Sequence, residues 1–452
     1  MRSDSSVTAI YGIKQYKTME KDLIYKISGL NELYDAFYKA QKNSNWKASV
    51  QKFESNLFAN LNEISNLIRT NKYEQKPFNA FKLNERGHVR LIKSLHISDR
   101  VVQRTVCDNI LTPYLNKYLI YDNGASQKNK GIDFCRKRLS VHLQKYIRKH
   151  GTDGYILLCD FRKFFDNISH EKLLEIFVKY IKDEKAINFI KKLIDTFKID
   201  VSYLSESERK EAVNQVFNSL EYEKIDKKAL TGKAFIYKSV GIGSQISQIA
   251  GIVYASEIDN YIKIVKGIKY YARYMDDFYV IDKDKQFLKA LLIQIKEISS
   301  RLGLTLSDNK TQIRKLSAGF RFLKIKYSIT KTGHIVKRVC SQNITRHRRK
   351  LRKLKKKVES GRIKFPDVFN MHKSWVGNLK RFDCYRTLNN IQNYFNSLFK
   401  KEIENYERKR KARTKNTRFN IPADVELFTD WRLENSKIPG IFSNRATSAI
   451  RY

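Results

Sequence analysis

Two short apolar segments of this chain lead into aspartates, and this pairing constrains the fold more than any other feature of the sequence. The first segment, Tyr155–Cys159, runs directly into Asp160. The second region, residues 268–281, is rich in Tyr, Phe and Val on either side of a turn that contains Asp276 and Asp277. Short apolar runs bounded by turns are typical of strands buried in a sheet. We therefore expect one sheet with all three acids clustered at its strand ends.

Carboxylates that lie close together repel one another, and a divalent cation is the usual relief. Hard oxygen ligands suit Mg²⁺, which keeps water and substrate phosphates as its other ligands. The acids therefore predict a site for two Mg²⁺ ions, with Mn²⁺ as an acceptable substitute. Such a pair of ions is suited to nucleotidyl transfer. Taken alone, Asp276 and Asp277 could equally be ordinary turn residues.

The charge of the chain indicates a polyanionic partner. Its 452 residues include 89 Lys and Arg but only 46 Asp and Glu, which gives a formal net charge of +43. A genome that favours lysine would explain the excess of Lys over Arg, but not the shortage of acids. Nucleic acid is the leading candidate partner, and an anionic membrane surface is the second.

The sequence offers no sign of a membrane protein or a secreted one. No apolar run is long enough to span a bilayer, and the first residues lack the apolar segment of a signal peptide. The five cysteines are widely spaced and contain no Cys-x-x-Cys pair, which argues against a disulfide framework and a zinc site. We expect a cytoplasmic protein without membrane contact, and homo-oligomers remain open.

In two places the sequence resembles the reverse transcriptases, in particular the bacterial retroelement-type enzymes. Residues 274–277 are similar to the Y-x-D-D box of that family, and residues 160–166 are similar to its first catalytic motif, D-x-x-x-x-F-D. Weaker motifs follow in the family's order between about Phe81 and Phe399. The resemblance implies an α+β fold, the right-hand polymerase of fingers, palm and thumb, with a ferredoxin-like palm sheet and a helical thumb.

The resemblance also implies a set of catalytic and metal-binding groups. The metal ions would be held by the backbone carbonyl of Phe161 and by the side chains of Asp160, Asp276 and Asp277. Lys310 lies in a motif whose lysine is thought to protonate the leaving pyrophosphate, so the resemblance makes it a fourth catalytic residue.

Phe165 lies five residues after Asp160, at the family's steric gate. A bulky aromatic ring there leaves no room for a 2′-hydroxyl, so the resemblance implies selection of dNTPs. The alternative is that Phe165 is a core residue, as one of Phe164 and Phe165 is expected to be.

The nucleotide-facing motif departs from the family's common form, G-L-P-Q-G-x-x-x-S-P. The chain has Ser239–Gln248 here, with Gly241 and Ile242 in place of Pro and Gln. Loss of that Gln predicts looser checking of base geometry. The S-x-Q ending resembles the diversity-generating, abortive-infection and defence-associated lineages. The expected nucleotide contacts in this segment are Gly243, Ser244, Gln245 and Gln248.

Basic side chains are expected to bind triphosphate and nucleic acid. In the predicted fingers they are Arg90, Lys128 and Lys130. After the palm comes a basic run in which a thumb helix would follow a duplex backbone, although such a run is often only a solvated face. Its expected contacts are Arg346, Arg348, Arg349, Lys350, Arg352, Lys353 and Lys356. A second run, Arg408–Arg418, could hold a partner RNA or be a disordered tail.

The expected organisation has five parts. They are an N-terminal helical region (1–75), fingers (76–150), a palm (151–340) with an insertion at about 198–238, a helical thumb (341–410) and a basic C-terminal tail (411–452).

The sequence thus predicts an RNA-directed DNA polymerase of a bacterial or phage system that copies a dedicated non-coding RNA, with antiviral defence as the setting. Its partners would be template RNA, a DNA product or primer, and dNTPs. Three alternatives remain: a diversity-generating retroelement enzyme, a template-independent or protein-primed DNA polymerase, and a non-catalytic, maturase-like RNA-binding scaffold.

Overall fold

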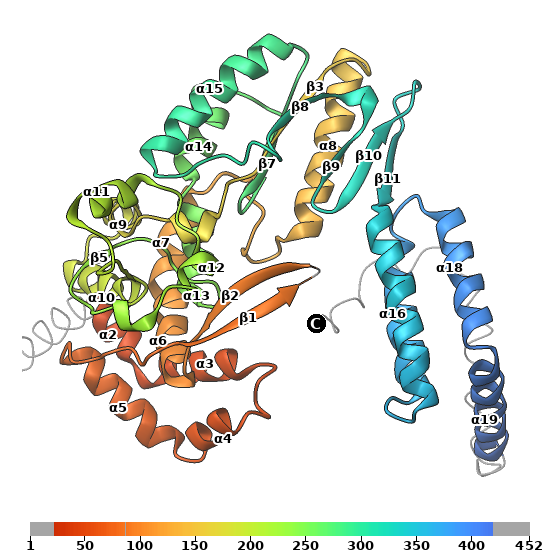
Figure 1. Cartoon of the computed structure of the whole chain (residues 1–452), viewed down its shortest axis with the longest axis horizontal. Coiled ribbons are helices and arrows are strands. Elements are labelled where there is room, and N and C mark those ends of the chain that lie inside the picture. Colours follow the sequence, from red (N-terminus) through yellow and green to blue (C-terminus); the bar gives the residue numbers. More distant parts are fainter. Residues whose placement is uncertain (1–21, 86, 419–452) are drawn as a thin grey trace, which may run out of the picture. The chain divides into compact units, whose positions relative to one another are not determined.

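The computed structural model describes residues 22–85 and 87–418 (Figure 1). The chain divides into two compact units between Val336 and Lys337. The start of the expected N-terminal region (1–21) and most of the expected tail (419–452) lie outside the described residues.

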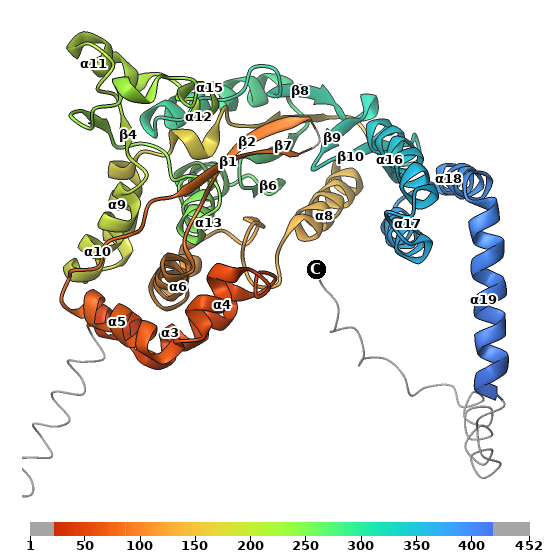
Figure 2. The same ribbon diagram turned by 60° about the horizontal axis from the view of Figure 1, so that its bottom comes forward.

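The described chain begins with four helices whose apolar residues recur at helical spacing. This spacing gives each longer helix one apolar face, which packs into the core. In the second helix the buried apolar positions are Leu33, Ala36, Phe37 and Ala40. Helices α2, α3 and α4 contact α6, and α5 packs on these three helices (Figure 2). The bounds are α2 (Leu23–Ser28), α3 (Leu30–Gln41), α4 (Ala48–Glu54) and α5 (Leu57–Arg69).

The next part is an antiparallel hairpin followed by helices. The hairpin is paired from Asn79–Ser94 to Glu85–His88. The helix after it continues through a π-helical turn, Cys107–Leu111, into α7. The bounds are β1 (Asn79–Glu85), β2 (His88–Ser94), α6 (Ile97–Val106), α7 (Thr112–Leu115) and α8 (Ile132–His150).

The central sheet has the strand order β6-β7-β3-β8, and every pairing in it is antiparallel. The chain visits β3, β6, β7 and β8 in turn, with helices between β3 and β6 and again between β7 and β8. The expected ferredoxin-like sheet is therefore present. The bounds are β3 (Tyr155–Cys159), β6 (Tyr271–Tyr274), β7 (Asp277–Asp282) and β8 (Gln312–Lys315).

Helices flank this sheet and supply most of the large core. Ser244 accepts a hydrogen bond at the start of α13, as an N-cap residue should. The long helix α15 contacts β7 and β8. The bounds are α9 (His170–Tyr180), α10 (Glu184–Asp195), α13 (Gln245–Val253), α14 (Ser256–Asn260) and α15 (Lys285–Arg301).

The expected insertion folds into a small lobe with its own apolar cluster of Ile199, Val201 and Ile236. The lobe is bonded to the loop after β3. Ser219 donates to Asp166 from its amide (3.1 Å) and its hydroxyl (3.0 Å). The bounds are β4 (Ile199–Asp200), α11 (Glu206–Asn214), α12 (Ser219–Tyr222) and β5 (Phe235–Ile236).

Beyond β8, strands β9 (Phe320–Phe322) and β10 (Ile325–Ile329) form a tight antiparallel hairpin. The chain then passes through β11 (Ile335–Val339) into the second unit.

The second unit is helical. His347 and Leu351 are the buried residues of α16, so its many cations fall on the exposed side. The expected boundary between thumb and tail at residue 410 lies inside α19, and this helix continues to Arg418. The bounds are α16 (Ser341–Glu359), α17 (Phe365–Leu379), α18 (Tyr385–Leu398) and α19 (Lys400–Arg418).

Within the described ranges, no helix is both long and apolar enough to cross a membrane. The five cysteines are all buried, and none of them forms a disulfide.

Candidate active site

The turn between β6 and β7 presents two of the predicted acids. Tyr274 pairs with Asp277, which leaves Met275 and Asp276 as the two turn residues. Met275 has a φ of +55°. Two-residue hairpin turns require this left-handed region, which residues other than glycine rarely occupy.

The register of the sheet brings the third acid to the same edge. Cys159 pairs with Phe278 on the neighbouring strand β7. Asp160 follows Cys159, and Asp277 precedes Phe278, so the antiparallel pairing sets these two acids beside each other.

The electrostatics reflect this crowding. Burial and the charge of Asp160 raise the pKa of Asp276 to about 6, although Lys310 and Arg90 act in the opposite direction. Burial, followed by the charges of Asp276 and Asp160, also raises the pKa of Asp277. Burial and the neighbouring carboxylates thus both disfavour the charged forms of Asp276 and Asp277.

The ammonium group of Lys310 contacts the carboxylate of Asp160. Its Nζ is 2.9 Å from both carboxylate oxygens, and Asp160 is only 5% exposed. The loop before Lys310 is fixed to the same segment, because Ser307 N donates to Asp160 O at 2.8 Å. Burial disfavours the charged ammonium, but the bond to Asp160 outweighs it and raises the Lys310 pKa. Lys310 is thus protonated at neutral pH.

The donor set suits a hard divalent cation. Asp160 at the end of β3, and Asp276 and Asp277 at the start of β7, supply carboxylate oxygens as ligands. Nearby carboxylates contribute to the raised pKa values of Asp276 and Asp277, and a bound cation would relieve this repulsion. In the part of the chain that the structure describes, no group of three or more His, Cys, Asp or Glu side chains is arranged so that it could hold a metal ion.

Phe165 lies near the turn between β6 and β7. A Cβ atom built on Gly251 of α13 would be 3.0 Å from Phe165 Cε1 and 3.0 Å from Met275 Sδ. The ring therefore packs between α13 and the turn. Phe164 is 3% exposed and belongs to the core, whereas Phe165 is half-buried.

Two glycines shape the segment that leads into α13. Gly241 has a φ of +62°, and a Cβ there would lie 2.5 Å from Phe197 Cε1. Gly243 has a φ of +124°, and its Cβ would lie 3.0 Å from the carbonyl oxygen of Lys93. Only glycine suits either position, so the departure from the family's Pro at 241 has a structural reason.

The other predicted nucleotide contacts lie at the start of α13. Ser244 is buried and caps the helix, so its hydroxyl is already used. Gln245 is half-buried and accepts from Arg104 Nη1 at 3.4 Å. Gln248 is exposed and lies three residues before Gly251, on the helix face that reaches the turn.

A family model described as "Reverse transcriptase (RNA-dependent DNA polymerase)" matches residues 76–327, more than half of the chain. The chain belongs to the reverse transcriptase family. The expected α+β right-hand polymerase fold is thereby confirmed, and reverse transcriptase domains generally use divalent metal ions.

Known proteins similar to this reverse transcriptase include the "Putative COX1/OXI3 intron 1 protein" of Saccharomyces cerevisiae. It is 26% identical over 146 residues, which are 31% of this chain but only 16% of the yeast protein. Similar solved structures include apo telomerase from Candida Tropicalis truncated from its C-terminal domain, with a TM-score of 0.37, 14% identity, and coverage of 61% of this chain and 59% of that one. Another is telomerase from Candida albicans in complex with a TWJ fragment of telomeric RNA, with a TM-score of 0.39, 13% identity, and coverage of 72% and 59%.

The three basic residues predicted to contact triphosphate in the fingers differ in their surroundings. Arg90 on β2 is close enough to the acids to lower the pKa of Asp276. Lys128 is exposed. Lys130 donates to the carbonyls of Tyr121 (2.9 Å) and Asn123 (3.0 Å), within its own loop. A triphosphate contact by Lys130 would require these bonds to open.

The seven cations predicted to bind nucleic acid all lie on α16 and are exposed. They belong to the second unit and lie around the part of the α16 surface that does not bury His347 and Leu351, and the Arg348 guanidinium lies 5.5 Å from the centre of the Tyr394 ring on α18. By contrast, Lys355 is half-buried and paired with Glu359 and Glu402.

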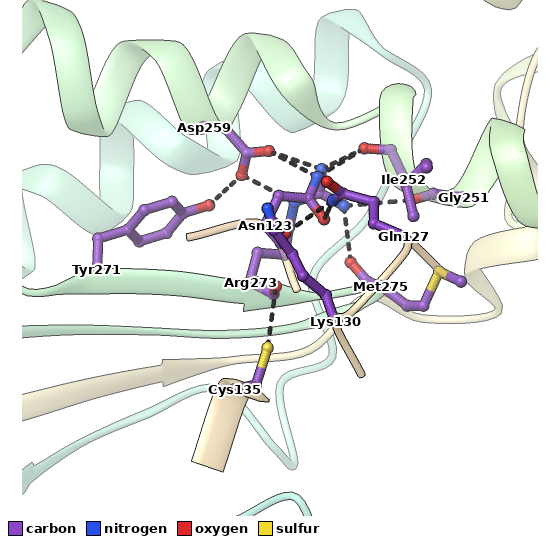
Figure 3. Close-up of polar contacts among 10 residues, drawn as sticks. All are labelled: Asn123, Gln127, Lys130, Cys135, Gly251, Ile252, Asp259, Tyr271, Arg273 and Met275. Carbon is purple, nitrogen blue, oxygen red and sulfur yellow. Dashed lines mark hydrogen bonds and ion pairs between the residues drawn. The ribbon is translucent and has the colours of Figure 1, made fainter. Parts of the chain in front are cut away.

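Sequence reasoning missed Arg273, which lies in β6 at the centre of a buried network (Figure 3). It is paired with Asp259 and donates to the carbonyl of Met275 in the turn between β6 and β7. A basic residue inside an otherwise apolar strand was the available signal, because such a charge must find a partner when it is buried.

Proposed function

We propose that this reverse transcriptase is a catalytically active RNA-directed DNA polymerase that adds dNTPs to a DNA 3′ end by nucleotidyl transfer with two Mg²⁺ ions. One observation carries the proposal: the strand register brings Asp160 and Asp277 side by side, with Asp276 in the adjoining turn. This is the crowded set of carboxylates that such chemistry needs.

The side chains divide the work. Asp160, Asp276 and Asp277, with the Phe161 carbonyl, would hold the ions, which when bound favour the attacking hydroxylate and offset charge on the leaving pyrophosphate. Lys310 carries a proton in the site and can pass it to the pyrophosphate.

Primer extension by acid variants tests this proposal. We expect Asp276→Ala with Asp277→Ala to abolish dTTP incorporation on a poly(rA)–oligo(dT) template–primer. Asp282→Ala, at the other end of β7, is the matched control and should retain activity. Undiminished extension by the double variant would overturn the assignment of the site.

We also propose a cytoplasmic role in a bacterial or phage defence system, with a dedicated non-coding RNA as template. The unusual segment Ser239–Gln248 supports this lineage over those that copy their template faithfully. Sequencing of the RNA and DNA that co-purify with the protein from its host tests the proposal. One abundant RNA with its DNA complement is the expected result. DNA variants of a target gene would favour the diversity-generating alternative, and untemplated DNA joined to the protein would favour the protein-primed one.

A second candidate is an RNA-binding scaffold that does not polymerise. The similarity to a yeast intron protein and the exposed cations of α16 favour it. If the cellular phenotype survives the double Asp variant, the scaffold role accounts for the biology.

A further inference from the structure

The ion pair between Arg273 and Asp259 has no part in the chemistry described above, although it is among the most deeply buried charges in the described chain. Both side chains are essentially inaccessible, at 0% and 1% exposure. The guanidinium binds the carboxylate with two bonds, Nε to Oδ1 at 2.8 Å and Nη2 to Oδ2 at 2.7 Å. Burying two charges is costly, so a pair like this is weak evidence of a stabilising role.

The remaining guanidinium protons reach the catalytic turn. Arg273 Nη1 donates to the carbonyl of Met275 at 2.9 Å and to that of Gly251 at 3.2 Å. Nη2 also donates to the carbonyl of Ile252 at 2.7 Å. One planar group thus ties the turn that carries Asp276 to the end of α13 (Figure 3).

The carboxylate of Asp259 is itself held in place. The Tyr271 hydroxyl donates to its Oδ1 at 2.5 Å, and Asn123 Nδ2 lies 3.4 Å from its Oδ2. The Asn123 loop also joins the backbone of the strand, because Gly124 N donates to the carbonyl of Arg273 at 3.0 Å. The fingers loop, α14 and β6 therefore converge on this pair.

The catalytic turn needs such support for two reasons. Met275 is held at a φ of +55°, a strained conformation that persists only where its surroundings impose it. The strand register also places Asp277 beside Asp160, with Asp276 in the adjoining turn, and because like charges repel, a loose turn would let these carboxylates move apart.

We propose that Arg273 is a positioning residue that holds the Met275 carbonyl and so fixes Asp276 and Asp277 beside Asp160 for metal binding. This inference rests on the proposed polymerase function. Arg273 does not reach the reacting atoms itself and acts through the turn.

The test variant is Arg273→Lys. Lysine keeps the charge, but its single ammonium cannot hold both carboxylate oxygens and three carbonyls in one plane. The matched control is Arg301→Lys, which alters an exposed ion pair between Arg301 and Glu257. Glu257 lies on α14, the helix that also carries Asp259. Two readouts are compared on folded protein: binding of Mn²⁺ alone, followed by electron paramagnetic resonance, and kcat and KM for dTTP on poly(rA)–oligo(dT).

For Arg273→Lys we expect Mn²⁺ affinity and kcat each to fall by about 10- to 100-fold, with KM for dTTP changed little. Arg301→Lys should match the wild type in both. Asp259→Asn, which keeps the shape of the partner but not its charge, should reproduce the loss if Arg273→Lys is poorly soluble.

Two outcomes would overturn the proposal. One is wild-type Mn²⁺ affinity and kcat in Arg273→Lys. The other is a fall in kcat that disappears when rates are divided by the folded fraction, which would make Arg273 merely structural. If the wild type binds Mn²⁺ but does not extend the primer, the proposed function fails, and the Mn²⁺ readout still decides the role of Arg273.

Discussion

The three acids of the site differ in how the fold compensates their charge. The Nζ atom of Lys310 lies 2.9 Å from an oxygen of Asp160. By contrast, Asp276 and Asp277 are buried, and their main charged neighbours are other carboxylates. The metal-free protein therefore keeps electrostatic repulsion at the site, and a divalent cation should release it.

Asp277→Asn should stabilise the metal-free protein, and more so at high pH. The folded pKa of Asp277 is raised, so its contribution to stability is present at low pH and is lost as pH rises through that pKa. Asparagine does not ionise, so the Asp277→Asn variant does not lose this stability as the pH rises. In EDTA, the variant's melting temperature should exceed the wild-type value by a wider margin at pH 8 than at pH 5.

The control for this measurement is Asp282→Asn, at the other end of β7. It should show no such pH-dependent gain. A margin for Asp277→Asn that is equal at the two pH values would contradict the repulsion described here.

Phe165→Ala should admit ribonucleotides. The half-buried ring lies beside the turn, and its loss opens space where a 2′-hydroxyl would otherwise clash. Discrimination between dTTP and UTP should drop by about 10- to 100-fold. Phe164→Leu, which changes the buried neighbour, should cost stability but keep discrimination, and unchanged sugar selection in Phe165→Ala would exclude the gate role.

At the scale of elements, the sequence predicts those parts of the site that are local. The apolar strand before Asp160 and the turn at Asp276 follow from residue pattern alone. The contact between Lys310 and Asp160, separated by 150 residues, comes instead from strand pairing.

The insertion illustrates the same limit. Its sequence is charged and weakly periodic, yet the lobe folds and is bonded to the loop after β3. The anchoring groups, Asp166 and Ser219, are separated by 53 residues. Asp166 ends the motif at residues 160–166, but nothing in the sequence marks Ser219 as its partner. Only the tertiary structure pairs them.

Ser219→Ala tests this anchor. Burial raises the pKa of Asp166, while the bonds from Ser219 lower it, so losing the hydroxyl leaves a poorly solvated carboxylate. The free energy of unfolding should fall by about 1–3 kcal/mol at pH 7. The loss should shrink as the pH falls and Asp166 becomes protonated, because the pKa of Asp166 is raised. Ser207→Ala, on the exposed helix α11, is the control, and an equal effect of both variants would argue against the anchor.

At the scale of the whole molecule, part of the net charge of +43 can be assigned to particular regions of the structure. Lys310 and Arg90 offset the acids of the site. The seven exposed cations of α16 form a separate set in the second unit, away from the buried residues His347 and Leu351. The sequence shows a basic run at residues 346–357, and the structure shows that this run is part of a helix on which the seven cations are exposed.

Substitution of Arg352 and Lys356 by Gln should weaken binding to RNA–DNA duplex without regard to sequence. Each lost phosphate contact should reduce the slope of log affinity against log salt by about 1. Fluorescence anisotropy across a salt series measures this slope. Lys355→Gln is the control, because Lys355 is already paired with Glu402, and a slope that stays the same in the double variant would assign these cations to a solvated face.

The most direct test of the central claim is primer extension on an RNA template of defined mixed sequence, with all four dNTPs and Mg²⁺, followed by sequencing of the product. We predict DNA complementary to the template, made by the wild type and absent with Asp276→Ala and Asp277→Ala. DNA whose sequence is unrelated to the RNA, or no DNA at all from folded, metal-bound protein, would contradict the account.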